Sequence, residues 1–107
     1  RRLGLVRSLA VEPKVLLMDE PLVSLDEFTR ESLQDEILKL WKGSDLTMVM
    51  VTHNLEEAIF LGERVGILTS QPASMKGLLE NSGMGQVDYR RSEEFYEKLK
   101  KLREYFS

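Results

Sequence analysis

Two short apolar segments, separated by a helical pattern, most constrain the fold of this chain. Residues 15–18 read Val-Leu-Leu-Met and residues 47–51 read Thr-Met-Val-Met-Val, and a third β-prone segment covers residues 64–69. Their shortness favours strands over helices. Strands that are apolar on both faces and alternate with helices are typical of a parallel sheet covered on both sides and joined by right-handed crossovers. The pattern predicts an α/β fold.

The segment between the first two strands has the signals of a helix. Ser24-Leu25-Asp26-Glu27 predicts a capping box, in which Ser24 and Glu27 satisfy free backbone amides reciprocally. The helix is expected to end at Gly43, since glycine commonly follows the last helical turn. Its predicted apolar face consists of Leu33, Ile37, Leu40 and Trp41.

The rest of the chain carries further cap and turn signals. Asn54 is expected to cap a helix that stops at Gly62. Residues 74–80 suit a strand in a hairpin with the third strand, and residues 81–89 suit a loop. Ser92 is then expected to cap a last helix. The apolar face of that helix is predicted to contain Phe95, Leu99, Leu102 and Phe106.

The first residues follow a helical pattern that lacks a start signal. Leu3, Val6, Leu9 and Ala10 recur at helical spacing, but no capping residue precedes them. We therefore expect that this helix continues upstream and that the chain is a fragment.

Composition excludes several classes of function. The 107 residues suffice for one small domain, and they contain no cysteine for disulfides or thiolate metal sites. The net charge of -3 gives no electrostatic footprint for nucleic acid. No apolar run approaches the roughly 20 residues that span a bilayer, and no signal peptide is recognisable. A cytoplasmic location is the expectation.

Charged side chains follow the first two predicted strands where each one ends. Asp19 and Glu20 end the first strand, and His53 follows the second. Neighbouring parallel strands bring their carboxyl ends together, and ligands bind beyond those ends in open α/β sheets. One carboxylate suits Mg²⁺ and the other suits a base for water, while the imidazole suits contact with a transferred phosphoryl group. The constellation predicts metal-assisted phosphoryl transfer.

Each of these features has an ordinary alternative. Asp-Glu-Pro at residues 19–21 is often only a polar turn, His53 alone is more often a cap or turn residue, and Asp26 suits a simple helix start. Their joint occurrence at matching strand ends favours the site.

Three motifs in order resemble the C-terminal half of an ATP-binding cassette (ABC) ATPase subunit, a P-loop NTPase fold. VLLMDEP resembles the Walker B strand, SLDE resembles the D-loop, and VTHN resembles the switch-histidine loop, or H-loop. The opening RRLGLVRSLAVEP resembles the helix after the LSGGQ signature. The resemblance implies that residues 1–72 form the C-terminal part of the ATPase core, and that residues 73–107 add a hairpin, a loop and an amphipathic helix to the same domain.

The resemblance also implies roles for four residues. Asp19 would serve Mg²⁺, Glu20 would be the general base, and His53 would contact the γ-phosphate of ATP. Asp26 would contribute to the nucleotide site across a dimer of nucleotide-binding subunits. The further partners implied are integral membrane permease subunits and a periplasmic or extracellular solute-binding protein, with this subunit on the inner face of the cell membrane.

Finer wording narrows the resemblance to importers of the nitrate, sulfonate and taurine type. DEFTRESLQDEILKLW and THNLEEAIFLGERVGIL are similar to their sequences, although Ser24, Asn54 and Gln71-Pro72-Ala73 depart from the usual residues. Those departures leave the transported solute open.

No G-x-x-x-x-G-K-[ST] loop occurs in the sequence, and this loop supplies most phosphate binding in such enzymes. We therefore expect the 107-residue chain alone to be inactive, and the whole subunit to be an ATPase that drives solute import. The alternatives are an ABC ATPase of DNA repair or translation, and a non-catalytic regulatory or interaction domain.

Overall fold

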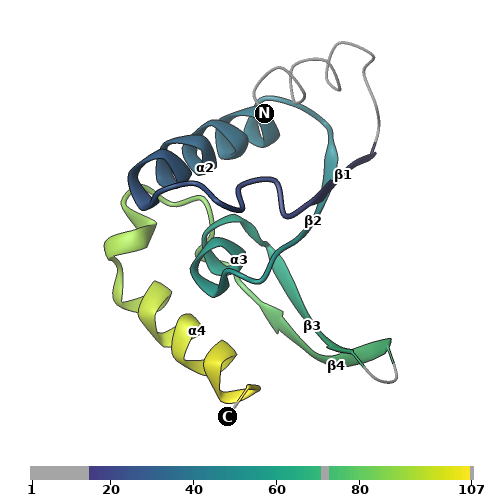
Figure 1. Cartoon of the computed structure of the whole chain (residues 1–107). Coiled ribbons are helices and arrows are strands. Elements are labelled where there is room, and N and C mark those ends of the chain that lie inside the picture. The colour runs from purple at the N-terminus through teal and green to yellow at the C-terminus, as the bar shows by residue number, and fades with distance from the viewer. Residues whose placement is uncertain (1–14, 71–72, 107) are drawn as a thin grey trace. The chain divides into compact units, whose positions relative to one another are not determined.

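The computed structural model describes residues 15–70 and 73–106 (Figure 1), so the helix expected around residues 3–10 lies outside the described residues. The described residues fall into two compact units that divide between His53 and Asn54. The elements, in chain order, are β1 (Val15–Asp19), α2 (Glu27–Lys42), β2 (Thr47–Val51), α3 (Leu55–Leu61), β3 (Arg64–Ser70), β4 (Ala73–Glu80), the 3-10 turn η1 (Tyr89–Arg91) and α4 (Glu93–Glu104). The division at residue 72 stays a prediction.

In the first unit, β1 and β2 form a parallel pair, as the alternation of strands and helices predicts. The register runs from Val15 opposite Thr47 to Asp19 opposite Val51. Leu16 is buried, whereas 73% of Leu17 is exposed. Successive side chains of a strand point to opposite faces, and in the described part of the chain only one face of β1 is packed. The expectation that both faces are covered is wrong for these residues.

The helix α2 ends as predicted, but its buried face is shifted. The amide of Gly43 donates to the carbonyl of Lys39 at 3.0 Å and closes the last turn. Ile37 and Gln34 are the buried residues of α2, whereas the predicted Leu33, Leu40 and Trp41 are only half-buried. A polar residue, Gln34, therefore lies in the packed stripe that the apolar pattern alone does not predict.

The second unit contains the predicted hairpin. β3 and β4 pair antiparallel from Arg64 opposite Glu80 to Ser70 opposite Ala73, with a register shift between Ile67 and Leu68. Within this unit β3 is paired with β4, and the extension of the parallel sheet by a third strand stays a prediction. A neighbour that follows within two residues closes a short loop, which costs little conformational entropy.

The helix α3 has both predicted ends. The side-chain oxygen of Asn54 accepts from the amide of Glu57 at 2.9 Å, and the amide of Gly62 donates to the carbonyl of Ala58 at 2.9 Å. These caps satisfy backbone groups that a seven-residue helix would otherwise leave open.

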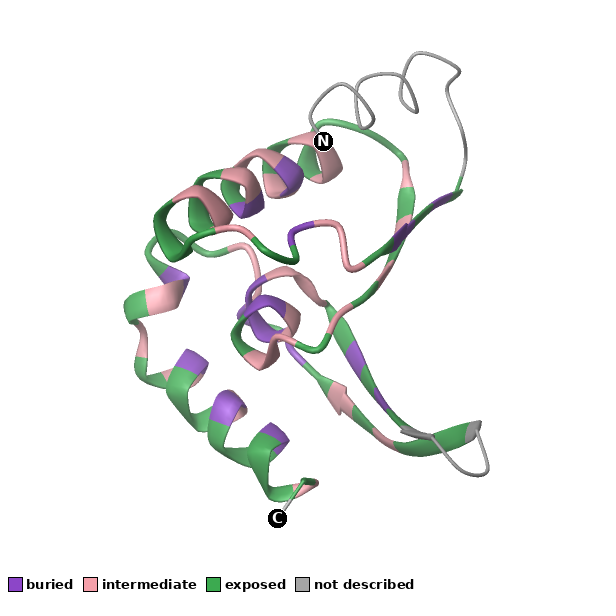
Figure 2. Cartoon of the chain, viewed as in Figure 1, coloured by how far each residue is buried: buried purple, intermediate pink, exposed green. Residues whose placement is uncertain are grey.

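The core of the second unit lies between α3, the β3–β4 hairpin and α4. The helix α4 packs on α3. Figure 2 shows the buried residues of α4 on one face of the helix. Ser92 caps α4, as predicted, by accepting from the amide of Phe95 at 3.1 Å. Phe106 is a correction: it lies beyond the end of α4 and is 61% exposed. The apolar core of the unit consists of Ile59, Phe60, Val65, Ile67, Tyr89, Phe95, Leu99 and Leu102.

Buried Asn81 ties the elements of this unit together. Its amide nitrogen donates to the carbonyls of Ile59 at 2.6 Å and Gly62 at 2.8 Å, which are the last turn and the cap of α3. The hydroxyl of Tyr89 donates to the side-chain oxygen of Asn81. The backbone amide of Asn81 donates to the carbonyl of Glu63 at 2.9 Å. The loop predicted for residues 81–89 is thus anchored at both ends.

None of the helices described here is both long and apolar enough to cross a membrane.

Candidate functional site

The parallel register of β1 and β2 places the predicted site residues at one end of the sheet. Asp19 ends β1 opposite Val51, the last residue of β2. The amide of Glu20 donates to the carbonyl of Val51 at 2.7 Å and so continues the pairing beyond the strand. His53 follows two residues after Val51. The segments that follow β1 and β2 therefore start next to each other.

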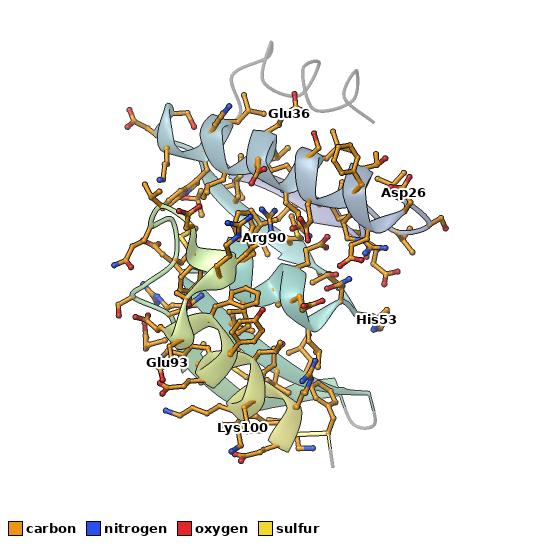
Figure 3. The ribbon with its side chains drawn as sticks, turned by 90° about the vertical axis from the view of Figure 1, so that its left-hand side faces the viewer. Asp26, Glu36, His53, Arg90, Glu93 and Lys100 are labelled. Carbon is orange, nitrogen blue, oxygen red and sulfur yellow. The ribbon has the colours of Figure 1, made fainter. Side chains whose placement is uncertain are left out.

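Glu20 and His53 meet at this end. Oε1 of Glu20 lies 3.3 Å from Nε2 of His53, and the side chains are 32% and 91% exposed. In Figure 3 the His53 side chain projects away from the ribbon. A contact between two side chains this exposed contributes little to the free energy of unfolding. What the arrangement provides is a carboxylate and an imidazole that both reach solvent, where a phosphorylated ligand has access.

The backbone of Glu20 is held in an unusual conformation. Its φ is 45°, in the left-handed region that non-glycine residues rarely adopt. Such a conformation costs about 1–3 kcal/mol and persists only where the surroundings impose it. Here the bond to Val51 and the burial of Leu22, 2% exposed, impose it. Strained backbone of this kind clusters at functional sites, which agrees with a role for the Glu20 side chain.

Asp19 is exposed at the end of β1. Among residues 15–70 and 73–106, no group of three or more acidic, histidine or cysteine side chains is placed to hold a metal ion. Mg²⁺ does not require such a cage, since it is usually bound by one or two carboxylates together with substrate phosphates and water. A single accessible carboxylate beside a second one fits that mode, so the donor set of Asp19 and Glu20 is compatible with Mg²⁺.

Asp26 is the cap of α2, and this corrects the predicted capping box. Oδ1 of Asp26 accepts from the amide of Thr29 at 2.8 Å, and Oδ2 accepts from the Thr29 hydroxyl at 2.9 Å. Ser24 lies two residues before the cap with a φ of 71°. Aspartate and serine cap helices about equally well, so sequence alone does not separate them. The left-handed turn at Ser24 makes Asp26 the capping residue.

The structure brings together Glu20 and His53 but gives Asp26 other partners. The hydrogen bonds of the Asp26 carboxylate go to Thr29, at the start of α2, where Figure 3 labels Asp26. Sequence reasoning missed Thr29 and Arg30, whose side chain donates to the carbonyl of Leu25 at 2.7 Å. An aspartate just before a helical pattern is a recognisable cap signal, whereas nothing in the sequence indicates the reach of Arg30.

The cap keeps the Asp26 carboxylate charged to a lower pH than that of an uncapped aspartate. The amide and then the hydroxyl of Thr29 hold the pKa of Asp26 below its usual range. A depressed folded-state pKa contributes stability above the unfolded pKa of about 3.9, and this contribution is lost as the pH falls through the folded value. We expect the Asp26 carboxyl resonance, followed by NMR, to titrate below about pH 3.9, and Thr29→Val to raise its midpoint. A midpoint at or above the unfolded value would contradict the cap.

Comparison with known proteins gives the site its context. No family model matches the sequence. The aliphatic sulfonates import ATP-binding protein SsuB of Bacillus cereus (strain ZK / E33L) is 38% identical over 106 residues, which are 99% of this chain and 42% of SsuB. The uncharacterized ABC transporter ATP-binding protein MJ0412 of Methanocaldococcus jannaschii is 40% identical over 102 residues, 95% of this chain and 38% of that protein. The taurine import ATP-binding protein TauB of Roseobacter denitrificans is 49% identical over 72 residues, 67% of this chain and 27% of TauB.

The chain therefore spans less than half the length of the curated relatives that it matches. A parallel pair of strands with a helix between them makes this a small α/β protein. Within that class, the chain belongs to the family of ABC transporter ATP-binding proteins. This agrees with the resemblance carried by VLLMDEP, SLDE and VTHN.

Proposed function

We propose that this chain is part of the ATP-hydrolysing subunit of an ABC importer of the nitrate, sulfonate and taurine type. The observation that carries the proposal is the contact of Glu20 with His53 at the adjoining ends of β1 and β2. Relatives named as import ATP-binding proteins for sulfonates and for taurine support it. The reaction is the transfer of the γ-phosphoryl group of ATP to water.

Each residue of the site has a distinct part in this reaction. Glu20 orients the attacking water and accepts its proton as the new P–O bond forms, while the bond to the ADP oxygen breaks. His53 donates from Nε2 to the γ-phosphoryl oxygens, on which charge is spread in the transition state. Asp19 is the carboxylate that would hold Mg²⁺. When bound, Mg²⁺ neutralises charge on the phosphate oxygens.

The whole subunit is proposed to work in an assembly. Two nucleotide-binding subunits form a homodimer, and Asp26 contributes to the nucleotide site at the interface between them. Integral membrane permease subunits hold that dimer at the inner, cytoplasmic face of the membrane, and a periplasmic or extracellular binding protein delivers the solute. No nucleic acid takes part, in keeping with the net charge of -3.

The 107-residue chain by itself is proposed to be inactive. Its sequence has no glycine-rich phosphate loop with its lysine, and these groups supply most of the binding energy for the phosphates of ATP. Asp19 and Glu20 alone give a metal–nucleotide complex only a few exposed contacts. Mg²⁺-dependent ATP hydrolysis by the purified 107-residue chain would contradict this part of the proposal.

Substitution of Asp19 tests the metal role in the intact subunit. We expect Asp19→Asn to raise the Mg²⁺ concentration for half-maximal ATP hydrolysis by at least about 10-fold, the smallest loss typical when only a hydrogen-bond partner of a metal ligand is removed. A Mg²⁺ titration of the steady-state rate measures it. Asp45→Asn, which removes an exposed carboxylate from the turn before β2, is the matched control and is expected to leave the titration unchanged. Equal Mg²⁺ dependence of Asp19→Asn and the unmodified subunit would contradict the assignment.

A further inference from the structure

The loop that carries Glu20, residues 20–26, is fixed at both ends. At its start, the amide of Glu20 is bonded to the carbonyl of Val51. At its end, Leu25 and Asp26 receive four hydrogen bonds from two consecutive residues of α2. Thr29 donates from its amide and its hydroxyl to the Asp26 carboxylate, at 2.8 and 2.9 Å. Arg30 donates from its amide to the Asp26 carbonyl at 2.9 Å and from Nη2 to the Leu25 carbonyl at 2.7 Å.

The Arg30 contact is not explained by the stability of α2 itself. Leu25 precedes the cap, so its carbonyl accepts no bond of the helical ladder. A cation near the N-terminus of a helix is disfavoured by the helix dipole, which favours cations at the other end. An arginine guanidinium is a charged donor, and hydrogen bonds from charged donors are stronger than neutral ones. The partly buried bond across five residues therefore serves the loop rather than the helix.

Little freedom remains between the two anchored ends. Leu22 is 2% exposed and fixes the middle of the loop by burial. The amide of Val23 donates to the carbonyl of Glu20 at 3.4 Å, which closes a turn directly behind the carboxylate. Ser24 is left-handed, with a φ of 71°. A rotation of the Leu25 carbonyl therefore changes the backbone dihedral angles of these few residues. Glu20, which has a φ of 45°, lies at the other end of the same short segment.

We propose that Arg30, assisted by Thr29, is a positioning residue for Glu20. By holding the carbonyl of Leu25 and the cap at Asp26, it keeps the loop in the conformation in which Oε1 of Glu20 lies beside Nε2 of His53. The catalytic consequence rests on the proposed function, whereas the hold on the loop does not. Small displacements of a reacting group cost large factors in rate, so a loosened loop lowers the rate without removing any group that touches ATP.

The test uses three variants of the intact subunit. Arg30→Met keeps a long apolar stem but removes every donor, Arg30→Lys keeps one charged donor, and Lys39→Met removes a positive charge from the far end of α2 as the matched control. We expect Arg30→Met to lower kcat about 10- to 100-fold with KM for ATP unchanged, because only the placement of Glu20 is affected. Arg30→Lys is expected to recover part of the loss, and Lys39→Met to match the unmodified subunit.

Amide hydrogen exchange gives a second readout that does not depend on ATP hydrolysis. Arg30→Met is expected to speed exchange in the peptide covering residues 20–26, including the Val23 amide, while the amides of β1 and β2 keep their protection. Lys39→Met is expected to change neither.

The outcomes separate the two proposals. Unchanged exchange in residues 20–26 of Arg30→Met overturns the hold on the loop, whatever the ATPase rates are. Faster exchange with an unchanged kcat overturns the positioning of Glu20 but leaves the hold. Full activity of Glu20→Gln in the same assay overturns the proposed function instead. An equal loss of kcat in Arg30→Lys and Arg30→Met, with exchange raised across the whole chain, overturns positioning in favour of general destabilisation.

Discussion

Replacing Glu20 by Gln in the intact subunit is expected to lower kcat for ATP hydrolysis by about 10²–10⁴-fold, the contribution of a positioned general base. The amide is nearly isosteric but does not accept the proton of the attacking water. ATP binding is expected to remain, since the phosphates are held mainly by other groups of the subunit. Single-turnover phosphate release and equilibrium binding of labelled ATP measure the two quantities separately.

Two variants accompany this substitution. Glu97→Gln removes an exposed carboxylate from the middle of α4 and is expected to leave kcat unchanged. Glu20→Asp keeps the base but withdraws it by one methylene, so an intermediate loss is expected. If Glu20→Gln kept more than about a tenth of kcat, the loss would be smaller than the smallest contribution expected of a general base, and the assignment would be wrong.

Replacing Asn81 by Ala is expected to have the largest effect on stability. The substitution removes two donors to α3 and the acceptor of the Tyr89 hydroxyl, at a site that is 1% exposed. Buried polar groups left without partners cost about 1–3 kcal/mol each. We expect the free energy of unfolding to fall by about 3–4 kcal/mol and Tm to fall by more than about 10 °C. Urea and thermal unfolding measure these changes.

Tyr89→Phe isolates one bond of the same network. Burial and then the charge of Glu94 raise the pKa of Tyr89, so its phenol stays protonated and donates at neutral pH. Loss of the hydroxyl alone is expected to cost about 1 kcal/mol. Ser82→Ala, an exposed neighbour of Asn81, is the control and is expected to stay within about 0.5 kcal/mol. Asn81→Ala within that same range would show that the network does not hold the unit together.

Much of the local structure could be predicted because its signals are local. Short apolar runs define β1 and β2. Gly43 ends α2, which lies between these strands, and Gly62 ends α3, which follows β2. Asn54 and Ser92 each cap a helix by accepting from the amide three residues on, as their positions predict. The parallel pairing of β1 with β2 follows from the helix between them.

The errors arose where two local signals compete or where burial decides. Ser24 and Asp26 are both capable caps, and the turn after β1 selects Asp26. Phe106 continues the apolar spacing of α4, but the helix ends at Glu104. In each case the pattern is correct for a neighbouring residue or element, and packing chooses between the options.

For the candidate site, the sequence alone determined which side chains end the strands, because residue order and strand direction place Asp19, Glu20 and His53 at the same edge. Only the tertiary structure decided that Glu20 turns toward His53, since that orientation depends on a left-handed backbone held by Val51 and by buried Leu22. The same holds for Arg30, whose reach to Leu25 depends on how the loop folds back on α2. Spacing fixes the order and direction of groups, whereas their distances depend on the loop that packing selects.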